Sequence, residues 1–229
     1  MAGALQRAKS AGLAPRTVID VGVADGTFDL YNGFPDSRFL LIEPMAEFEP
    51  ALRAICRQFD GEYVLAAAAA RGGSASISFG GDLQGASLSH AENTSREIPT
   101  VTVDGVVEER GAEPPFLLKV DVQGSEFEVL AGAEKTLAKT DMVILEVPMF
   151  DFAGNGITMV ETVAKMNDLG FVPHDIFDGL ARPLDGALGQ VDIAFVSSAH
   201  TIRQKRVWSS PGQAERGQVV HKVRRFLRV

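Results

Sequence analysis

The sequence predicts an α/β fold in which a mostly parallel, seven-stranded sheet carries helices on both faces. Three observations support this prediction. Short apolar runs alternate along the chain with segments of helical periodicity. The first run ends in a turn with two glycines, and acidic residues stand at the ends of several later runs. A β-rich segment, residues 72–103, interrupts the alternation before the fourth strand.

Each element has a local reason. The expected strands are short and rich in β-branched and aliphatic residues, and prolines follow the second and fifth. They cover residues 17–21, 38–42, 63–67, 116–120, 142–147, 171–176 and 191–196. Helices are expected up to residue 11, from residue 27, and over residues 46–59, 125–139 and 158–169. Ser125 and Glu128 have the spacing of a capping box at the start of the fourth helix.

The segment 72–103 alternates small polar with apolar residues at 74–79 and again at 98–103. This pattern predicts an antiparallel excursion from the main sheet. The polar loop between the two runs, residues 80–97, is interpreted either as a lid over a site or as a disordered segment. His90 in this loop is a candidate substrate-binding residue.

Composition limits the function classes. The 229 residues, 45% of them hydrophobic, suffice for one domain, expected over residues 1–200. A net charge of −8 argues against a nucleic-acid partner. There is no apolar run of membrane-spanning length and no long apolar leader, so the expected location is the cytoplasm.

Residues 201–229 form a tail of opposite charge. From Arg203 onward the tail has eight basic residues and one acid. Residues 219–229 have the spacing of a short basic amphipathic helix. Docking onto the domain or onto a second subunit of a homo-oligomer is the favoured interpretation. An anionic membrane surface is the alternative.

The turn after the first strand is typical of a nucleotide-type cofactor loop. Asp20, Gly22 and Gly26 lie where the strand would pass into a helix, and glycine there lets a ligand lie against the backbone. A dinucleotide motif would need glycines at positions occupied by Ala24 and Thr27. The pattern Asp-x-Gly-x-x-x-Gly instead resembles the first motif of class I methyltransferases, which bind S-adenosylmethionine.

A second motif, within residues 117–137, makes the resemblance specific. An apolar strand is followed by Lys-x-Asp-x-x-Gly-x-Glu and then by a helix with a Val-Leu-x-Gly-Ala ending. The chain here is similar to the FkbM family of methyltransferases, at Lys119, Asp121, Gly124, Glu126, Val129, Leu130, Gly132 and Ala133. Gln123 departs from the family, which usually has Glu at this position. The resemblance implies a class I methyltransferase fold and methyl transfer to a hydroxyl of a sugar, glycan or secondary metabolite.

Parallel sheets bind ligands at the carboxyl ends of their strands, and this rule sorts the predicted cofactor residues. Glu43 ends the second strand, where a carboxylate can accept both ribose hydroxyls of an adenosine. Ala68 is small enough to admit the adenine ring near the third strand. Gly22, Val23 and Gly26 are predicted to approach the methionine part, and Asp20 to orient its amino group directly or through water.

Asp121 is the predicted catalytic base, because methyl transfer to a hydroxyl also requires removal of its proton. Lys119 lies two residues earlier and is expected to pair with an acid or hold the substrate. Glu146, near the end of the fifth strand, is a second candidate for substrate contact or base. Glu126 is interpreted either as a pocket residue that binds substrate or as a stabiliser of the positive helix end.

The sequence also bears on a metal site and on two alternative functions. No histidine or cysteine spacing indicates a metal site, and no required ion is expected. A nicotinamide-dependent oxidoreductase is the enzymatic alternative. The non-enzymatic alternative is a protein that binds the cofactor without catalysis and serves as a partner in an assembly. The expected partner is a small-molecule or glycan acceptor.

Overall fold

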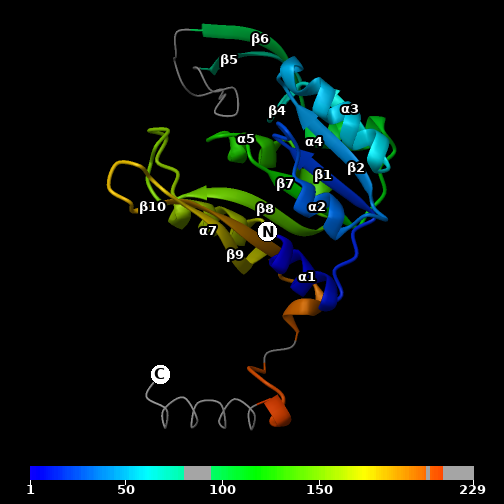
Figure 1. Cartoon of the computed structure of the whole chain (residues 1–229), viewed down its shortest axis with the longest axis vertical. Coiled ribbons are helices and arrows are strands. Elements are labelled where there is room, and N and C mark those ends of the chain that lie inside the picture. The colour runs from blue at the N-terminus through cyan, green and yellow to red at the C-terminus, as the bar shows by residue number, and fades with distance from the viewer. Residues whose placement is uncertain (80–93, 205–206, 214–229) are drawn as a thin grey trace.

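The computed structural model describes residues 1–79, 94–204 and 207–213 of the chain. Its centre is a seven-stranded sheet with strand order β3-β2-β1-β7-β8-β10-β9 (Figure 1). Neighbouring strands from β3 to β8 pair in parallel, whereas β10 runs antiparallel to β8 and β9. The strands are β1 (Thr17–Val21), β2 (Arg38–Glu43), β3 (Gly61–Leu65), β7 (Phe116–Val120), β8 (Thr140–Pro148), β9 (Phe171–Ala181) and β10 (Leu188–Ser197).

The order of the strands reverses next to β1. The chain moves from β1 outward to β2 and β3, and then returns to place β7 on the other side of β1. In open α/β sheets the crevice at such a reversal is where ligands bind. The fold therefore places the carboxyl ends of β1 and β7 at its expected ligand site.

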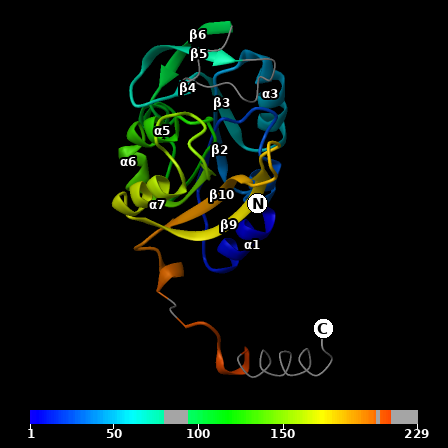
Figure 2. The same ribbon diagram turned by 90° about the vertical axis from the view of Figure 1, so that its left-hand side faces the viewer.

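Helices cover both faces of this sheet, as predicted (Figure 2). One group is α1 (Ala2–Ser10), α2 (Phe28–Gly33) and α3 (Glu49–Gln58). The other is α4 (Val103–Glu109), α5 (Glu126–Ala131), α6 (Glu134–Leu137) and α7 (Met159–Asp168). Two short 3₁₀ helices, η1 (Ala46–Phe48) and η2 (Thr201–Arg203), lie outside these layers.

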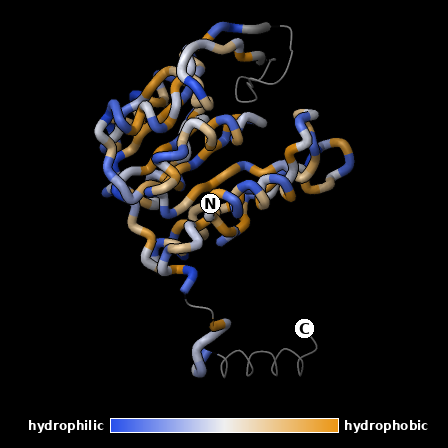
Figure 3. The backbone as a smooth tube through the Cα atoms, turned by 180° about the vertical axis from the view of Figure 1, so that it is seen from behind, coloured by the Kyte–Doolittle hydropathy of each residue, from blue (hydrophilic) through white to orange (hydrophobic). Residues whose placement is uncertain are grey.

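The alternation of side chains along each strand produces two cores. Ile19 and Val21 of β1 pack with residues of α4, α5, α6 and α7, whereas Val18 packs with residues of α1, α2 and α3. Figure 3 shows hydrophobic residues running through the central strands. Asp20 lies between Ile19 and Val21, so it faces the side of α1, α2 and α3.

A second sheet stands beyond the end of β3, with order β4-β6-β5 (Figure 1). Its strands are β4 (Ala67–Ala68), β5 (Gly73–Phe79) and β6 (Thr94–Val101), and β5 and β6 pair antiparallel. The prediction that the third main strand extends to residue 67 was wrong. That strand ends at Leu65, because residues 67–68 pair with β6 instead.

Two further boundaries differ from the expectations. Residues 125–139 form two helices rather than one, and Gly132 lies between them. The backbone of Ala69 passes close to it, since a Cβ on Gly132 would lie 2.1 Å from the carbonyl oxygen of Ala69. The expected capping box is absent, since the Ser125 side chain makes no cap hydrogen bond. Helix α4 was not predicted; Thr102 begins it by accepting a hydrogen bond from the backbone N–H of Gly105.

Within the described ranges no helix combines the length and the apolar character needed to cross a bilayer. The predicted helix at 219–229 and most of the predicted loop 80–97 lie outside the described residues. The domain boundary at residue 200 stays a prediction.

Candidate functional site

A cavity of about 580 Å³ opens at the carboxyl ends of the central strands. Five neighbouring strands contribute to it, and their register aligns one residue from each. Val21 of β1 pairs with Ile42 of β2 and with Val120 of β7. Val120 pairs with Leu145 of β8, which pairs with Ile193 of β10. One step further along these strands is a single row of residues that all line the cavity. This row consists of Glu43, Gly22, Asp121, Glu146 and Asp192.

The glycine loop after β1 forms one wall. Gly22 has a φ of +79° and Gly26 a φ of +109°, which favour glycine. A Cβ on Gly22 would lie 1.7 Å from the carbonyl oxygen of Asp121, so only glycine fits between β1 and β7. Ala24 also has a positive φ, of +45°. The predicted residues Gly22, Val23 and Gly26 line the cavity, and so does Ala24, which was not among the predicted residues.

Glu43 is positioned by the same loop. Its Oε2 accepts a hydrogen bond from the backbone N–H of Ala24 at 2.9 Å, and its Oε1 accepts one from Met45 at 2.9 Å. Burial raises the pKa of Glu43, and these backbone hydrogen bonds oppose the rise. The carboxylate is held rigidly at the end of β2, where it faces the cavity. Ala68 of β4 lines the cavity nearby.

Asp20, predicted to orient the amino group of the cofactor directly or through water, does not line the cavity. It is fully buried beneath the loop, where the Tyr31 hydroxyl donates a hydrogen bond to its Oδ2 at 2.6 Å. The ammonium of Lys119 lies 3.5 Å from its Oδ1, which has no hydrogen bond among the described residues. A direct contact between Asp20 and a ligand in the cavity is therefore not supported. The alternation of β1 side chains turns the carboxylate toward Tyr31 of α2.

Lys119 links the buried acid to the cavity. Its ammonium donates a hydrogen bond to Oδ2 of Asp121 at 3.3 Å, so it lies between two carboxylates. Burial alone would lower the pKa of Lys119, but the attraction of Asp20 and Asp121 outweighs it and the pKa is raised. Lys119 therefore remains charged and fixes the orientation of Asp121.

Gln123 extends this network to β8. Its side-chain amide donates to Oδ1 of Asp121 at 3.1 Å and to Oε2 of Glu146 at 2.9 Å. The amide of Gln190 on β10 donates to the other oxygen of Glu146. At position 123 the usual Glu of the family is thus replaced by Gln, whose side-chain amide donates hydrogen bonds to both Asp121 and Glu146. Gln123 adopts a φ of +55°, a costly conformation that places its side chain here.

The acids at this end of the cavity repel one another. Burial and the charges of Asp121, Glu126 and Asp192 raise the pKa of Glu146 to about 8. Burial and the charge of Asp121 raise the pKa of Asp192 to about 6. At neutral pH Glu146 therefore retains its proton more readily than Asp192 does.

The two predicted substrate residues have different outcomes. Glu126 is buried and does not line it; its Oε1 accepts hydrogen bonds from the backbone N–H groups of Val122 and Gly124, at 3.3 Å and 3.1 Å. Glu126 therefore holds the turn before α5, whereas the prediction placed it either in the pocket or at the positive helix end. His90 lies outside the described residues.

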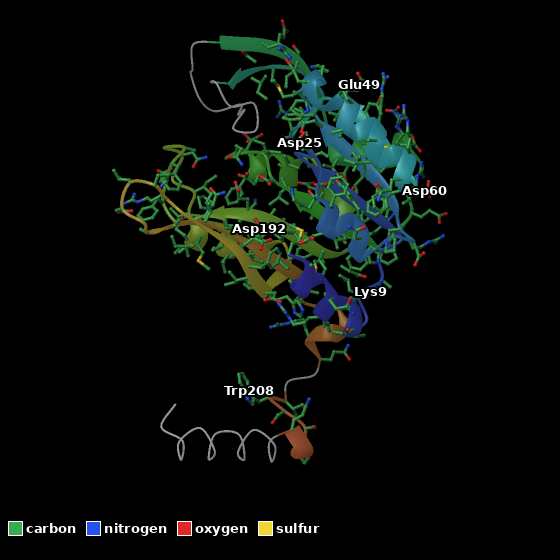
Figure 4. All side chains as sticks on the ribbon, in the orientation of Figure 1. Lys9, Asp25, Glu49, Asp60, Asp192 and Trp208 are labelled. Atoms are coloured by element: carbon green, nitrogen blue, oxygen red, sulfur yellow. The ribbon has the colours of Figure 1, made fainter. Side chains whose placement is uncertain are left out.

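The sequence did not single out several residues that the fold brings to the cavity. Asp192 and Gln190 come from β10, and Asp25 comes from the glycine loop; Figure 4 labels Asp25 and Asp192. Asp192 stands within an apolar strand and could have been noticed as an acid in a buried run. Its position opposite Glu146 depends on the register between β8 and β10, and this register cannot be predicted from the residues of either strand alone.

The cavity fits the cofactor that the resemblance implies. Its volume of about 580 Å³ is that of a small-molecule site. Glu43 presents a fixed carboxylate at one side, and the glycine loop leaves no side chain between the backbone and the cavity at Gly22. The cavity holds acids beyond those that Lys119 can pair with, and this charge suits a cationic sulfonium.

Comparison with solved structures finds methyltransferases of low sequence similarity. An rRNA methylase from Streptococcus thermophilus has a TM-score of 0.48 at 12% identity, over 86% of this chain and 93% of that one. The N-methyltransferase NodS from Bradyrhizobium japonicum has a TM-score of 0.46 at 9% identity, over 86% and 93%. Fibrillarin from Aeropyrum pernix, with bound S-adenosylmethionine, has a TM-score of 0.46 at 15% identity, over 84% and 74%.

Sequence comparison identifies the family. No curated protein matches the chain. The methyltransferase FkbM domain matches residues 20–173, which is more than half of the chain and includes both sequence motifs. The protein therefore belongs to the FkbM methyltransferase family, and its methyl donor is S-adenosylmethionine.

Proposed function

We propose that this methyltransferase methylates a hydroxyl group of a sugar, glycan or secondary metabolite. The single observation that carries the proposal is the network of Lys119, Asp121, Gln123 and Glu146 at the end of the cavity away from Glu43. It presents a fixed carboxylate and several polar groups where an acceptor would lie. Such a lining suits a polar, hydroxylated molecule better than an apolar one.

The donor lies, in this proposal, between Glu43 and the glycine loop. Glu43 accepts hydrogen bonds from the ribose hydroxyls, and Gly22, Val23 and Gly26 contact the methionine part. Ala68 adjoins the adenine ring. When bound, S-adenosylmethionine supplies a methyl group to the acceptor oxygen, and its sulfur keeps the electron pair of the broken carbon–sulfur bond.

Asp121 is the proposed proton acceptor. Its carboxylate takes the proton that the acceptor hydroxyl loses as the new carbon–oxygen bond forms. Lys119 and Gln123 hold the two oxygens of Asp121 in place, which reduces the cost of orienting them during the reaction. Glu146, which retains a proton at neutral pH, contacts the acceptor as a hydrogen-bonding group.

The isosteric variant Asp121→Asn tests this role. We expect the variant to bind S-adenosylhomocysteine with unchanged affinity in calorimetry and to lose about 100-fold or more in kcat once an acceptor is in hand. Asp141→Asn, an equivalent change outside the cavity, is the control and should retain full activity. Undiminished methyl transfer by Asp121→Asn would remove Asp121 as the proton acceptor.

Calorimetry with S-adenosylmethionine, S-adenosylhomocysteine and NAD in parallel tests the cofactor against the nicotinamide alternative. Binding of the first two ligands without NAD is the expected result. We also propose that no metal ion is required, so activity should survive a chelator; activity that is abolished and then restored by magnesium would contradict this. If the donor binds and no hydroxylated acceptor is methylated, the non-catalytic alternative is favoured.

A further inference from the structure

Asp192 shares the cavity with Asp121 but belongs to a different part of the chain. It lies on β10, directly opposite Glu146 of β8, and lines the cavity. In the sheet β8 separates β7 from β10, so the backbones at Asp121 and Asp192 are about two strand spacings, or about 10 Å, apart. The side chains of this row point to the same face of the sheet. Two carboxyl groups therefore border the proposed acceptor end from two sides.

The hydrogen bonds distinguish Asp192 from its neighbours. Both oxygens of Asp121 accept hydrogen bonds, from Lys119 and Gln123. Both oxygens of Glu146 also accept hydrogen bonds, from the amides of Gln123 and Gln190. Asp192 makes no hydrogen bond and no ion pair with any part of the chain that the structure describes, although it is half-buried.

The charges near Asp192 explain why a ligand donor would be favourable there. It faces the carboxylates of Asp121 and Asp178 and two ammonium groups. The ammonium of Lys119 is already engaged by Asp20 and Asp121, and the N-terminal ammonium is already engaged by Asp178. Above pH 6 Asp192 carries a charge that burial has partly desolvated. A carboxylate that loses its remaining water without gaining a donor is costly. An acceptor that fills the cavity thus has to supply that donor.

We propose that Asp192 is a specificity-determining residue that accepts a hydrogen bond from a second hydroxyl of the acceptor. The acceptor is then a polyhydroxylated ring, which presents one hydroxyl to Asp121 and another to Asp192. The proposal rests on the methyl-transfer function proposed above. A simple alcohol would leave Asp192 unpaired in a filled cavity, and sites built around a hydroxyl discriminate strongly against molecules that lack it.

The test measures binding of sugar rings to the complex with S-adenosylhomocysteine. The probes are methyl α-glucoside, methyl α-mannoside and methyl α-galactoside, each compared with its monodeoxy analogues by calorimetry. For the protein with its natural sequence, we expect one ring to bind and one of its deoxy analogues to bind about tenfold or more weakly. In Asp192→Ala the two should bind equally, because the partner of the missing hydroxyl is gone.

Two further variants separate recognition from general damage. Asp192→Asn keeps a carbonyl acceptor and should retain part of the discrimination. Asp141→Ala removes a half-buried aspartate outside the cavity and should retain all of it. With a ring that is methylated, Asp192→Ala should raise KM with little change in kcat, whereas Asp121→Asn should lower kcat.

The outcomes are distinct. Unchanged discrimination in Asp192→Ala overturns the proposal. The proposal is also overturned if none of the three rings binds to a protein that still binds S-adenosylhomocysteine. In that case the proposed methyltransferase function stands without the role of Asp192. Failure to bind S-adenosylhomocysteine at all would instead refute the proposed function itself.

Discussion

At the scale of single residues, a continuous set of polar side chains connects the helix layer with the cavity. Tyr31 of α2 bonds to Asp20, Lys119 lies between Asp20 and Asp121, and Gln123 joins Asp121 to Glu146. Buried charges are tolerated when each has partners, and this set supplies them. The Asp121 carboxylate is therefore linked through Lys119 to Asp20 and Tyr31, which do not line the cavity.

The buried end of this set gives a stability prediction. Tyr31→Phe removes the hydroxyl that donates to buried Asp20, so we expect a loss of about 1–3 kcal/mol, or about 3–10 °C in Tm by thermal denaturation. The other tyrosine is a matched control, because its hydroxyl bonds to Glu49 and Arg53 near the surface. Tyr63→Phe should cost less than about 1 kcal/mol. Equal losses in the two variants would contradict the role given to Tyr31.

Glu146 gives a prediction about pH. Its pKa of about 8 in the folded protein is above the ordinary value of 4.5, so the folded state holds a proton that the unfolded state loses. Glu146 therefore lowers stability progressively as pH rises from about 4.5 through 8. The Glu146→Gln side chain cannot titrate. We therefore expect the Tm of the variant minus the Tm of the natural protein to be about 2–4 °C or more larger at pH 9 than at pH 5. A Tm difference that does not change with pH would refute this prediction. So would a change with pH equal to that of the exposed control Glu108→Gln.

At the scale of elements, glycine decides how closely β1 and β7 approach. Gly22→Ala would place a Cβ against the Asp121 carbonyl at a positive φ, so we expect a loss of about 3 kcal/mol or more together with loss of S-adenosylhomocysteine binding. Gly111 also has a positive φ, of +57°, but open space around its Cβ position. Gly111→Ala should therefore cost only about 1–2 kcal/mol and leave binding intact. Denaturant unfolding and calorimetry of both variants test the difference.

The element predictions succeeded where periodicity was local. The seven main strands and the helices before β2 and after β8 follow from apolar runs and helical spacing in the sequence. The boundaries were wrong where another segment intervened. Ala67 looked like the end of β3 but pairs with β6, and Gly132 looked like helix interior but meets the Ala69 backbone. Contacts between segments distant in sequence overrode local propensity at both places.

At the scale of the whole molecule, the binding site spans both sides of the strand reversal. A ligand there joins the loop after β1, the ends of β2 and β7, and β10. We expect S-adenosylhomocysteine at 100 times its Kd to stabilise the fold by about 2.7 kcal/mol, which is about 5–10 °C in Tm. NAD at the same concentration should leave Tm unchanged, and an equal shift with NAD would contradict the assignment of the cofactor.

The amino-acid sequence was enough to predict the fold class, the family and several residues that line the cavity. Gly22, Glu43 and Asp121 could be predicted because each stands at the end of a recognisable apolar strand, and the ends of parallel strands meet at one edge; Gly26 follows in the turn after the first strand. Only the tertiary structure decided what completes the acceptor end. Asp192 reaches the cavity through the antiparallel register of β8 and β10. Asp20 lies two residues before Gly22 and is buried against Tyr31 of α2, so its separation from the cavity depends on how that helix packs rather than on local pattern.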